Sequence, residues 1–199
     1  MTAAKRGRLL PLAFFARDPL EVAPDLLGKV LRHGDRAVRI VEVEAYRGPD
    51  DPASHAFRGP TPRTEIMFGP PGHLYVYFSY GMHWCANVVT HRRGEVGAVL
   101  LRAGAPIGGI DAMHSARPAA RRDRDLASGP AKLCQALGID GTFDGSDLRA
   151  STSPVRLLDD GTPPPPSPAI GRRVGISVAV DLPWRFSVPD DPHRSKPWD

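Results

Sequence analysis

One short acidic and aromatic run carries the side chains best suited to chemistry. The run 41–46 reads Val-Glu-Val-Glu-Ala-Tyr, and His55 follows it closely. In a strand with a two-residue period, Glu42, Glu44 and Tyr46 share one face. A carboxylate near the anomeric centre of a sugar helps to break its bond to nitrogen or oxygen, because it activates water and stabilises an oxocarbenium-like transition state. Glu44, beside two flat side chains, is a candidate for such chemistry in a pocket that holds a planar base.

The same run has a simpler interpretation. Glu42 and Glu44 could form the solvated face of an edge strand, and on the strand pattern alone this is the more common arrangement. The apolar positions also change partway along residues 37–46, from Val38 and Ile40 to Val43 and Ala45. Burial on both faces, or a β-bulge, would explain that change.

A tyrosine-rich segment follows further along the chain. Residues 74–80 predict a strand, Gly81 a turn and residues 83–90 a return strand, so that Tyr80 lies near the tip of a β-hairpin. Tyrosine is a good strand former, which is the structural explanation of this composition. The functional explanation is that Tyr77 lines a stacking pocket and that Tyr80 is a wedge that enters DNA and holds a nucleotide out of the duplex.

Other chemistries receive less support. The spacings of His55, His73, His83 and His91 match no compact zinc motif, and Cys85 has no neighbouring cysteine, so we expect no metal. The chain has no standard glycine-rich phosphate loop, and we expect no cofactor. A Ser-His-Asp triad is not excluded by counting residues, but no nucleophile-elbow pattern supports one.

The segments that must position these side chains are short and rich in turns. With 22 prolines and 20 glycines among 199 residues, the sequence predicts short elements between irregular loops. Residues 48–72 read as a long functional loop. We expect helical turns over 18–28, strands over 96–103 and 173–180, the first of them carrying Arg102 near its end, and a helix that starts at 128–130 and ends at Gly138.

The fold class expected from this pattern is α+β. We expect a single mixed domain over residues 1–199, with a curved antiparallel β-sheet, a protruding β-hairpin and a few surrounding helices. Residues 1–12 and 190–199 are expected to be flexible. A net charge of +4 attracts polyanions such as nucleic acid, but on charge alone a mildly basic soluble protein is the more common explanation. No apolar run is long enough to cross a membrane, and two cysteines suit a reducing cytoplasm, where we expect the protein to act.

Six motifs in order resemble the alkyladenine (3-methyladenine) DNA glycosylase family, over about residues 14–188. They are Val-Glu-Val-Glu-Ala-Tyr at 41–46, Ser-His at 54–55, Gly-His-Leu-Tyr-Val-Tyr-Phe-Ser-Tyr-Gly-Met at 72–82, Asn87, Ala-Val-Leu-Leu-Arg-Ala at 98–103 and Leu-Ala-Ser-Gly-Pro-Ala-Lys-Leu-Cys-Gln-Ala-Leu at 126–137. The resemblance implies an enzyme of base excision repair. It hydrolyses the N-glycosidic bond of alkylated or deaminated purines in double-stranded DNA and leaves an abasic site.

The resemblance also implies roles for individual residues. Glu44 matches the carboxylate that activates water, and Arg102 the arginine that helps to place it. The residues that sandwich the flipped base are matched by Tyr46, His55 and Tyr77, and Tyr80 matches the tyrosine that fills the gap in the duplex. Asn87 matches a pocket residue that in some members clashes with the guanine amino group. The family uses no metal and no lysine Schiff base, so we expect hydrolysis without strand cleavage, by a monomer that needs no membrane.

Two further hypotheses compete with the glycosylase. A minor-groove wedge protein that only senses distortion would not need both Glu44 and Arg102. A glycosidase acting on sugars would usually carry a second acidic residue across the scissile bond. Glu42 is too close in sequence for that role and Glu65 lies in a loop, so this is the weakest of the three hypotheses. The loop over 91–94 matches no functional residue of the family, and we take additional phosphate contacts as its expected role.

Overall fold

The structure is a computed structural model that describes residues 7–195. Parts of both ends expected to be flexible, residues 1–6 and 196–199, lie outside the described residues, whereas Arg8 and Leu9 pair with a strand of the sheet. The strands are β1 (Arg8–Leu9), β2 (Val30–His33), β3 (Arg36–Tyr46), β4 (Leu74–Ser79), β5 (His83–Val89), β6 (Ala98–Gly108), β7 (Val155–Asp159), β8 (Ala169–Gly171) and β9 (Arg185–Ser187). The helices are α1 (Leu12–Phe15), α2 (Pro19–Leu26), α3 (Ile110–Ala116) and α4 (Pro130–Leu137).

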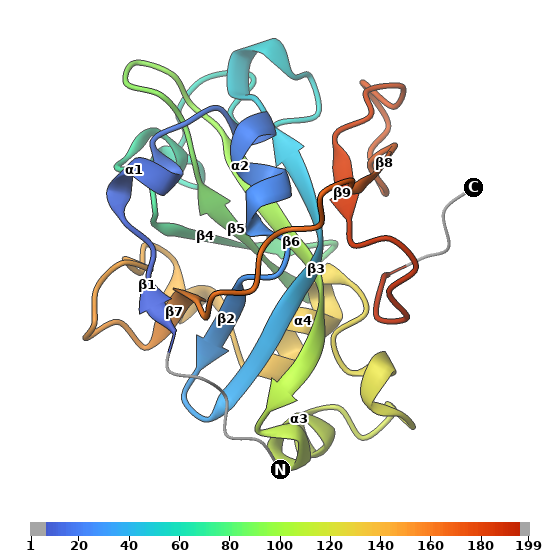
Figure 1. Cartoon of the computed structure of the whole chain (residues 1–199). Coiled ribbons are helices and arrows are strands. Elements are labelled where there is room, and N and C mark those ends of the chain that lie inside the picture. The colour runs from blue at the N-terminus through green and yellow to red at the C-terminus, as the bar shows by residue number, and fades with distance from the viewer. Residues whose placement is uncertain (1–6, 196–199) are drawn as a thin grey trace.

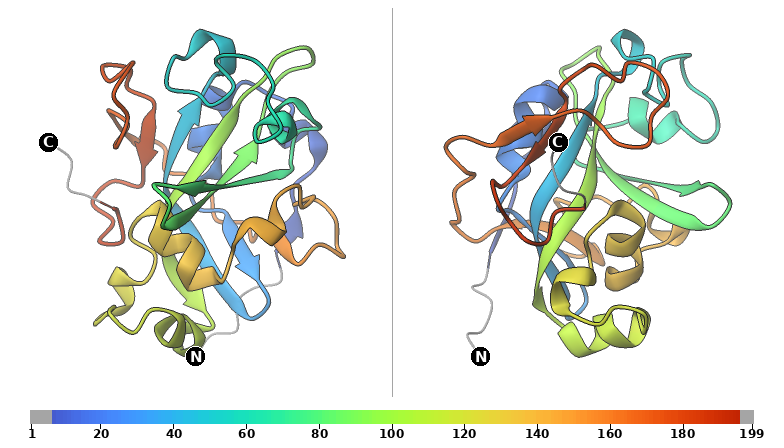
Figure 2. Two further views of the ribbon diagram at one scale, coloured as in Figure 1. Left: turned by 180° about the vertical axis from the view of Figure 1, so that it is seen from behind. Right: turned by 90° about the vertical axis from the view of Figure 1, so that its right-hand side faces the viewer.

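These strands form one antiparallel sheet that curls on itself (Figures 1 and 2). Its strand order is β1-β7-β2-β3-β6-β5-β4, with β9 added to β3 and β8 to β9. Helix α2 packs against β3 and β6, α4 packs against β5 and β6, and α3 packs against α4. The α+β class, the curved sheet and the few helices expected from the sequence are confirmed.

Strand β3 runs through the centre of this sheet. Its partners are β2, β6 and β9, and most of its side chains are buried. The pairing with β6 shifts register around Val41, which is the signature of a β-bulge. The mixed apolar pattern therefore has both of the causes considered from the sequence, burial on two faces and a bulge. The interpretation of β3 as a solvated edge strand is wrong, because both of its sides are hydrogen-bonded.

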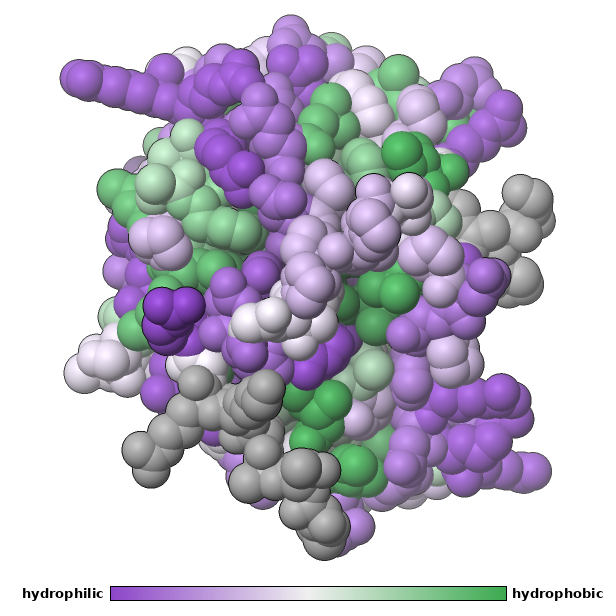
Figure 3. All heavy atoms as spheres, viewed as in Figure 1, coloured by the Kyte–Doolittle hydropathy of each residue, from purple (hydrophilic) through white to green (hydrophobic). Residues whose placement is uncertain are grey.

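The main hydrophobic core lies on the face of β3 that carries Val43 and Ala45. Apolar side chains of α2, α4 and the central strands join them there. Helix α2 begins at Asp18, whose carboxylate accepts a hydrogen bond from the backbone NH of Leu20 at 2.9 Å, and Pro19 occupies the first helical position. On the face of the molecule drawn in Figure 3, hydrophobic residues form separate areas among hydrophilic ones.

Strands β4 and β5 form the protruding hairpin (Figure 2). Ser79 pairs with His83, so the turn consists of Tyr80, Gly81 and Met82. Tyr80 has a positive φ of 52°, which ends the alternation of the strand and turns this side chain away from its place in the pleat. The hairpin with Tyr80 at its tip is therefore confirmed.

Candidate active site

The central strand β3 carries two carboxylates side by side on the face opposite the core. Glu42 and Glu44 are both fully buried, and Tyr46 follows on the same face. Such burial is unusual for carboxylates and requires compensating donors. The bulge at Val41 allows residues 42–46 to present this acidic and aromatic face while Val43 and Ala45 pack into the core.

Glu44 receives a donor from three separate segments. The Tyr46 hydroxyl donates to Oε2 at 2.9 Å, the Val174 backbone NH donates to Oε1 at 2.9 Å, and Nη1 of Arg102 lies 3.2 Å from Oε1. Burial nevertheless raises the pKa of Glu44, although Arg102, Val174 and Tyr46 each oppose that effect. A carboxylate with a raised pKa is a stronger base than one in water, which suits the activation of a nucleophile.

Arg102 of β6 links the two carboxylates. Its Nε donates to Oε1 of Glu42 at 3.1 Å, while its Nη1 faces Glu44. Glu42 also accepts from Nε of Arg185 on β9 at 2.6 Å and from the backbone NH of Ser195 at 2.6 Å. The site thus contains two buried carboxylates and two arginines in direct contact, and Arg102 is the link to Glu44.

Aromatic side chains of β4 form a wall beside this cluster. Tyr75 and Tyr77 stack with ring centroids 5.5 Å apart, and His55 meets Tyr77 edge-on at 4.5 Å. His55 Nδ1 lies 3.0 Å from the Tyr75 hydroxyl. Burial, with a contribution from Arg63, lowers the pKa of His55 to about 4, so the imidazole is neutral at physiological pH. A neutral, fixed imidazole offers one nitrogen for hydrogen bonding to a bound base.

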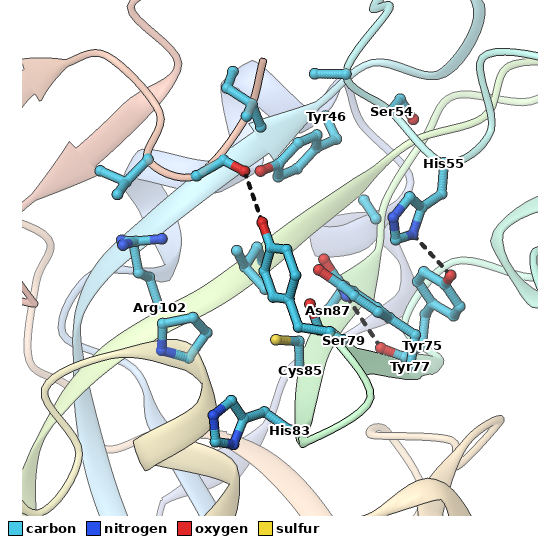
Figure 4. Close-up of a pocket in the computed structure, with 18 of the residues that line it drawn as sticks. Tyr46, Ser54, His55, Tyr75, Tyr77, Ser79, His83, Cys85, Asn87 and Arg102 are labelled. Carbon is cyan, nitrogen blue, oxygen red and sulfur yellow. Dashed lines mark hydrogen bonds between the residues drawn. The ribbon is translucent and has the colours of Figure 1, made fainter. Parts of the chain in front are cut away.

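A cavity of about 600 Å³ connects these elements (Figure 4). Its walls include six of the residues singled out from the sequence, namely Tyr46, His55, Tyr77, Tyr80, Asn87 and Arg102. Glu44 lies directly behind Tyr46 and Arg102 and is hydrogen-bonded or ion-paired to both. The Asn87 amide has a fixed orientation, because its Nδ2 donates to the Tyr75 carbonyl at 3.3 Å. The volume is sufficient for a planar base with its sugar.

The hairpin tip lies at the mouth of this cavity. The Tyr80 side chain is 81% exposed, and its hydroxyl approaches the Gly175 carbonyl at 3.4 Å. Residues 174–178 line the same cavity from the opposite side. An exposed aromatic ring at the entrance is therefore fixed by local backbone geometry and not by burial.

A buried ion pair that the sequence analysis missed ties the walls together. Arg173 and Asp51 are both fully buried, with contacts of 2.5 and 2.8 Å, and Arg173 also donates to the Ala45 carbonyl at 3.0 Å. The guanidinium lies over the rings of Tyr46 and Trp184, at 4.6 and 5.1 Å from their centroids. No sequence motif predicts this ion pair, because Asp51 and Arg173 lie far apart in the chain.

The segment 173–180 is not the strand expected from its composition. It is irregular, and the neighbouring strands are β8 and β9 instead. Its polar groups are used at the site: the backbone NH of Val174 donates to Glu44 and the side chain of Arg173 binds Asp51, while Val178 and Val180 are less than half exposed. This segment therefore contacts the site instead of pairing as a strand. Sequence periodicity does not predict such contacts.

The candidate histidines do not assemble a metal centre within residues 7–195. No group of three or more His, Cys, Asp or Glu side chains in that range is placed to hold an ion. His55 contacts Tyr75, whereas His73 and His91 lie close to backbone carbonyls of Pro70 and Gly69. In the same range, no helix has the length and apolar character needed to span a bilayer.

Comparison with known proteins identifies the family. The model of the family described as methylpurine-DNA glycosylase matches residues 13–192. A protein of Burkholderia lata named "Putative 3-methyladenine DNA glycosylase" is 55% identical over 192 residues, which cover 96% of this chain and 93% of the relative. Relatives with the same name from Agrobacterium fabrum and Streptomyces avermitilis are 50% and 48% identical, and the alignments cover 94% and 96% of this chain and 92% and 93% of the relatives.

These matches extend over nearly the whole chain and include the strands and loops that build the cavity. They place the protein among the DNA glycosylases, hydrolases of N-glycosyl bonds that act in DNA repair. Within that class, the chain belongs to the methylpurine-DNA glycosylase family. The family expected from the ordered sequence motifs is confirmed.

Proposed function

We propose that this protein removes alkylated or deaminated purines from double-stranded DNA. It turns the damaged nucleotide out of the helix into the aromatic cavity and hydrolyses its N-glycosidic bond, leaving an abasic site. The observation that carries the proposal is the position of Glu44. Its buried, arginine-paired carboxylate lies immediately behind a cavity lined by Tyr46, Tyr77 and His55. A stack of flat side chains beside a basic carboxylate fits a planar leaving group bound to a sugar.

In this proposal Glu44 is the catalytic base. Its Oε2 accepts one hydrogen bond, from Tyr46, and so keeps a lone pair that orients a water molecule. The water oxygen attacks C1′ and gives up a proton to Glu44, while the electrons of the C1′–N bond pass to the departing base. The negative charge of Glu44 also stabilises the oxocarbenium character of the sugar. Arg102 holds the carboxylate and the water in line.

Substrate selection follows from the walls of the cavity. Alkylation at N3 or N7 makes a purine cationic, which weakens its bond to the sugar and favours contact with the electron-rich faces of Tyr46 and Tyr77. Asn87 opposes the amino group of a normal guanine, because its amide is held in one orientation by Tyr75. A damaged pair also costs less to open, so flipping itself favours lesions.

Tyr80 stabilises the extruded state. Its ring enters the duplex from the hairpin tip and occupies the space that the flipped base leaves. The tip has little conformational freedom to lose, because β4 and β5 pair up to Ser79 and His83. Base release from duplex DNA therefore depends on Tyr80 more than base release from single strands does.

The reaction ends at the abasic site. Cleavage of the strand by β-elimination needs an amine that forms a Schiff base with the sugar, and none of the lysines within residues 7–195 lines the cavity. We therefore propose a monofunctional glycosylase that acts as a monomer, since one chain contributes every group invoked in the mechanism.

Base release from a panel of duplexes tests the proposal. Each duplex carries one lesion, 3-methyladenine, 7-methylguanine, ethenoadenine or hypoxanthine, and is incubated with wild type or with Glu44→Gln. We expect wild type to produce abasic sites that break only on alkali treatment. Glu44→Gln should retain duplex binding and lose product. Near-normal single-turnover rates for Glu44→Gln would refute the catalytic assignment, and release of no base by wild type would refute the activity.

A further inference from the structure

The second carboxylate, Glu42, has no part in the reaction proposed for Glu44. It does not line the cavity, yet its side chain is fully buried and accepts four hydrogen bonds. The donors are Nε of Arg102 at 3.1 Å, Nε of Arg185 at 2.6 Å, and the hydroxyl and backbone NH of Ser195 at 3.0 and 2.6 Å. These donors compensate the burial of both carboxylate oxygens.

Arg102 lies between the two carboxylates and forms an ion pair with each of them. Its Nε is directed at Glu42, and its Nη1 lies 3.2 Å from Glu44 on the same guanidinium plane. Because a guanidinium is planar and rigid, fixing Nε fixes the direction of Nη1. With 7% of its side chain exposed, Arg102 has little room for another rotamer.

We propose that Glu42 is a positioning residue that acts through Arg102. It holds the guanidinium in the orientation that aligns Glu44, and it shares the charge of Arg102 so that Glu44 is not fully neutralised. The inference rests on the proposed role of Glu44 and adds a second carboxylate that never touches the substrate.

Ser195 extends this arrangement into the C-terminal segment. Its hydroxyl donates to Glu42 and accepts from Nε of Arg102 at 2.9 Å, so it closes a ring of three polar groups. The residue lies just beyond residue 192, where the match to the family model ends. This C-terminal segment therefore supports the site from behind, although it forms no part of the cavity wall.

The electrostatic consequence can be measured as a pH profile. The charged and titratable groups around Glu44 within residues 7–195 include Glu42 and Tyr46 of β3, Arg102 of β6, Tyr77 of β4, Cys85 of β5 and Arg185 of β9, which pairs with Glu44 in the sheet. The Val174 NH adds a backbone donor. Among them, Glu42 raises the pKa of Glu44 by like-charge repulsion, and Arg102 lowers it. Without the charge on Glu42, Arg102 acts on Glu44 alone, and the pKa of Glu44 falls.

Single-turnover base release by full-length Glu42→Gln, at saturating enzyme and across pH, tests the inference. We expect the rate at neutral pH to fall by roughly 10–100-fold, because Arg102 loses its alignment. The enzyme concentration at half-saturation should be unchanged, since Glu42 does not touch DNA. The acid limb of the pH–rate profile should move to lower pH. Glu21→Gln, the same change in an exposed glutamate paired with Arg92, should match wild type in the rate at saturation and in the acid limb.

Ser195→Ala provides a milder test if Glu42→Gln does not fold. It keeps the charge of Glu42 and removes one donor to it, so we expect a rate loss of several-fold with an unchanged acid limb. A Glu42→Gln enzyme with the rate and acid limb of wild type would overturn the inference, as would a fully active Ser195→Ala enzyme. If either variant behaves like wild type while Glu44→Gln is inactive, only the role of Glu42 is refuted and the proposed function is retained. An inactive wild type refutes the proposed function itself.

Discussion

Three donors to the Glu44 carboxylate counteract the effect of its complete burial on its pKa. Burial favours the protonated acid, while Arg102, the Val174 NH and the Tyr46 hydroxyl favour the anion. The last of these comes from a ring that also faces the cavity, so Tyr46 has two separable functions. In the proposed mechanism its ring forms part of the base pocket, while its hydroxyl lowers the pKa of the carboxylate behind it.

The two functions of Tyr46 separate in Tyr46→Phe, which keeps the ring and removes the hydroxyl. Loss of a hydrogen bond to the anion raises the pKa of Glu44 further. Because the ionised form of Glu44 is the active one in the proposed mechanism, we expect activity to disappear at a higher pH as the solution is acidified. We expect a roughly tenfold lower rate near neutral pH, from one lost charge-assisted hydrogen bond. The pH–rate profile of single-turnover base release measures the shift, which is opposite in sign to that expected for Glu42→Gln. An unshifted acid limb would contradict this account of Tyr46.

The hairpin of β4 and β5 has an unusual residue in its turn, namely Tyr80. Tyr80 adopts a left-handed backbone conformation that costs a tyrosine about 1 kcal/mol or more. Its ring is exposed and so gains little from burial. The strain and the exposure together indicate that the tip is shaped for a partner and not for the stability of the free protein.

Tyr80→Asn tests this interpretation of the hairpin. Asparagine tolerates positive φ, so the variant should be as stable as wild type or more stable by a few tenths of a kcal/mol. Without the aromatic wedge, base release from duplex DNA should fall by at least about tenfold, since unstacking costs a few kcal/mol. Thermal unfolding and single-turnover kinetics measure the two effects. A stable variant with the wild-type rate on duplex DNA would exclude the wedge role.

The two irregular walls of the cavity depend on the ion pair between Asp51 and Arg173. Breaking a buried pair leaves one uncompensated charge, so Asp51→Asn should lower the free energy of unfolding by about 3–5 kcal/mol. A double variant, Asp51→Leu with Arg173→Met, should recover much of that stability. It should not recover activity, because Arg173 also contacts Ala45 and Tyr46. Urea unfolding and base release measure the two outcomes, and a cost below about 1 kcal/mol for Asp51→Asn would contradict the role of the pair.

The sequence predicted regular elements better than it predicted the walls between them. The alternation of β4, the turn at Gly81 and the proline and glycine that bound α4 are local signals, and each produced the expected element. The cluster of Glu42 with Arg185 and Ser195 depends on contacts across most of the chain, so no local pattern contains it. Segment 173–180 shows the same limit, because its strand-like composition was overridden by the contacts of Arg173 and Val174 with the site.

The whole molecule combines a neutralised interior site with a basic overall charge. Glu42 and Glu44 are balanced by Arg102 and Arg185 inside the protein, whereas the chain as a whole carries a net charge of +4. Attraction to duplex DNA and the chemical step are thus supplied by different groups. In the proposed function, surface arginines and lysines bind phosphates at any sequence, and the buried cluster acts only after a base has entered the cavity.

This division predicts that salt affects binding and not chemistry. Each phosphate contact releases condensed counterions, so about five contacts would weaken duplex binding by roughly 100–1,000-fold between 50 and 200 mM salt. Fluorescence anisotropy with an undamaged duplex measures this slope. The single-turnover rate at saturating enzyme should stay nearly constant over the same range, because ions do not screen charges buried as deeply as Glu44 and Arg102. A rate at saturation that fell in parallel with affinity would show that surface charges contribute to the chemical step, and the separation between surface and buried cluster would then be wrong.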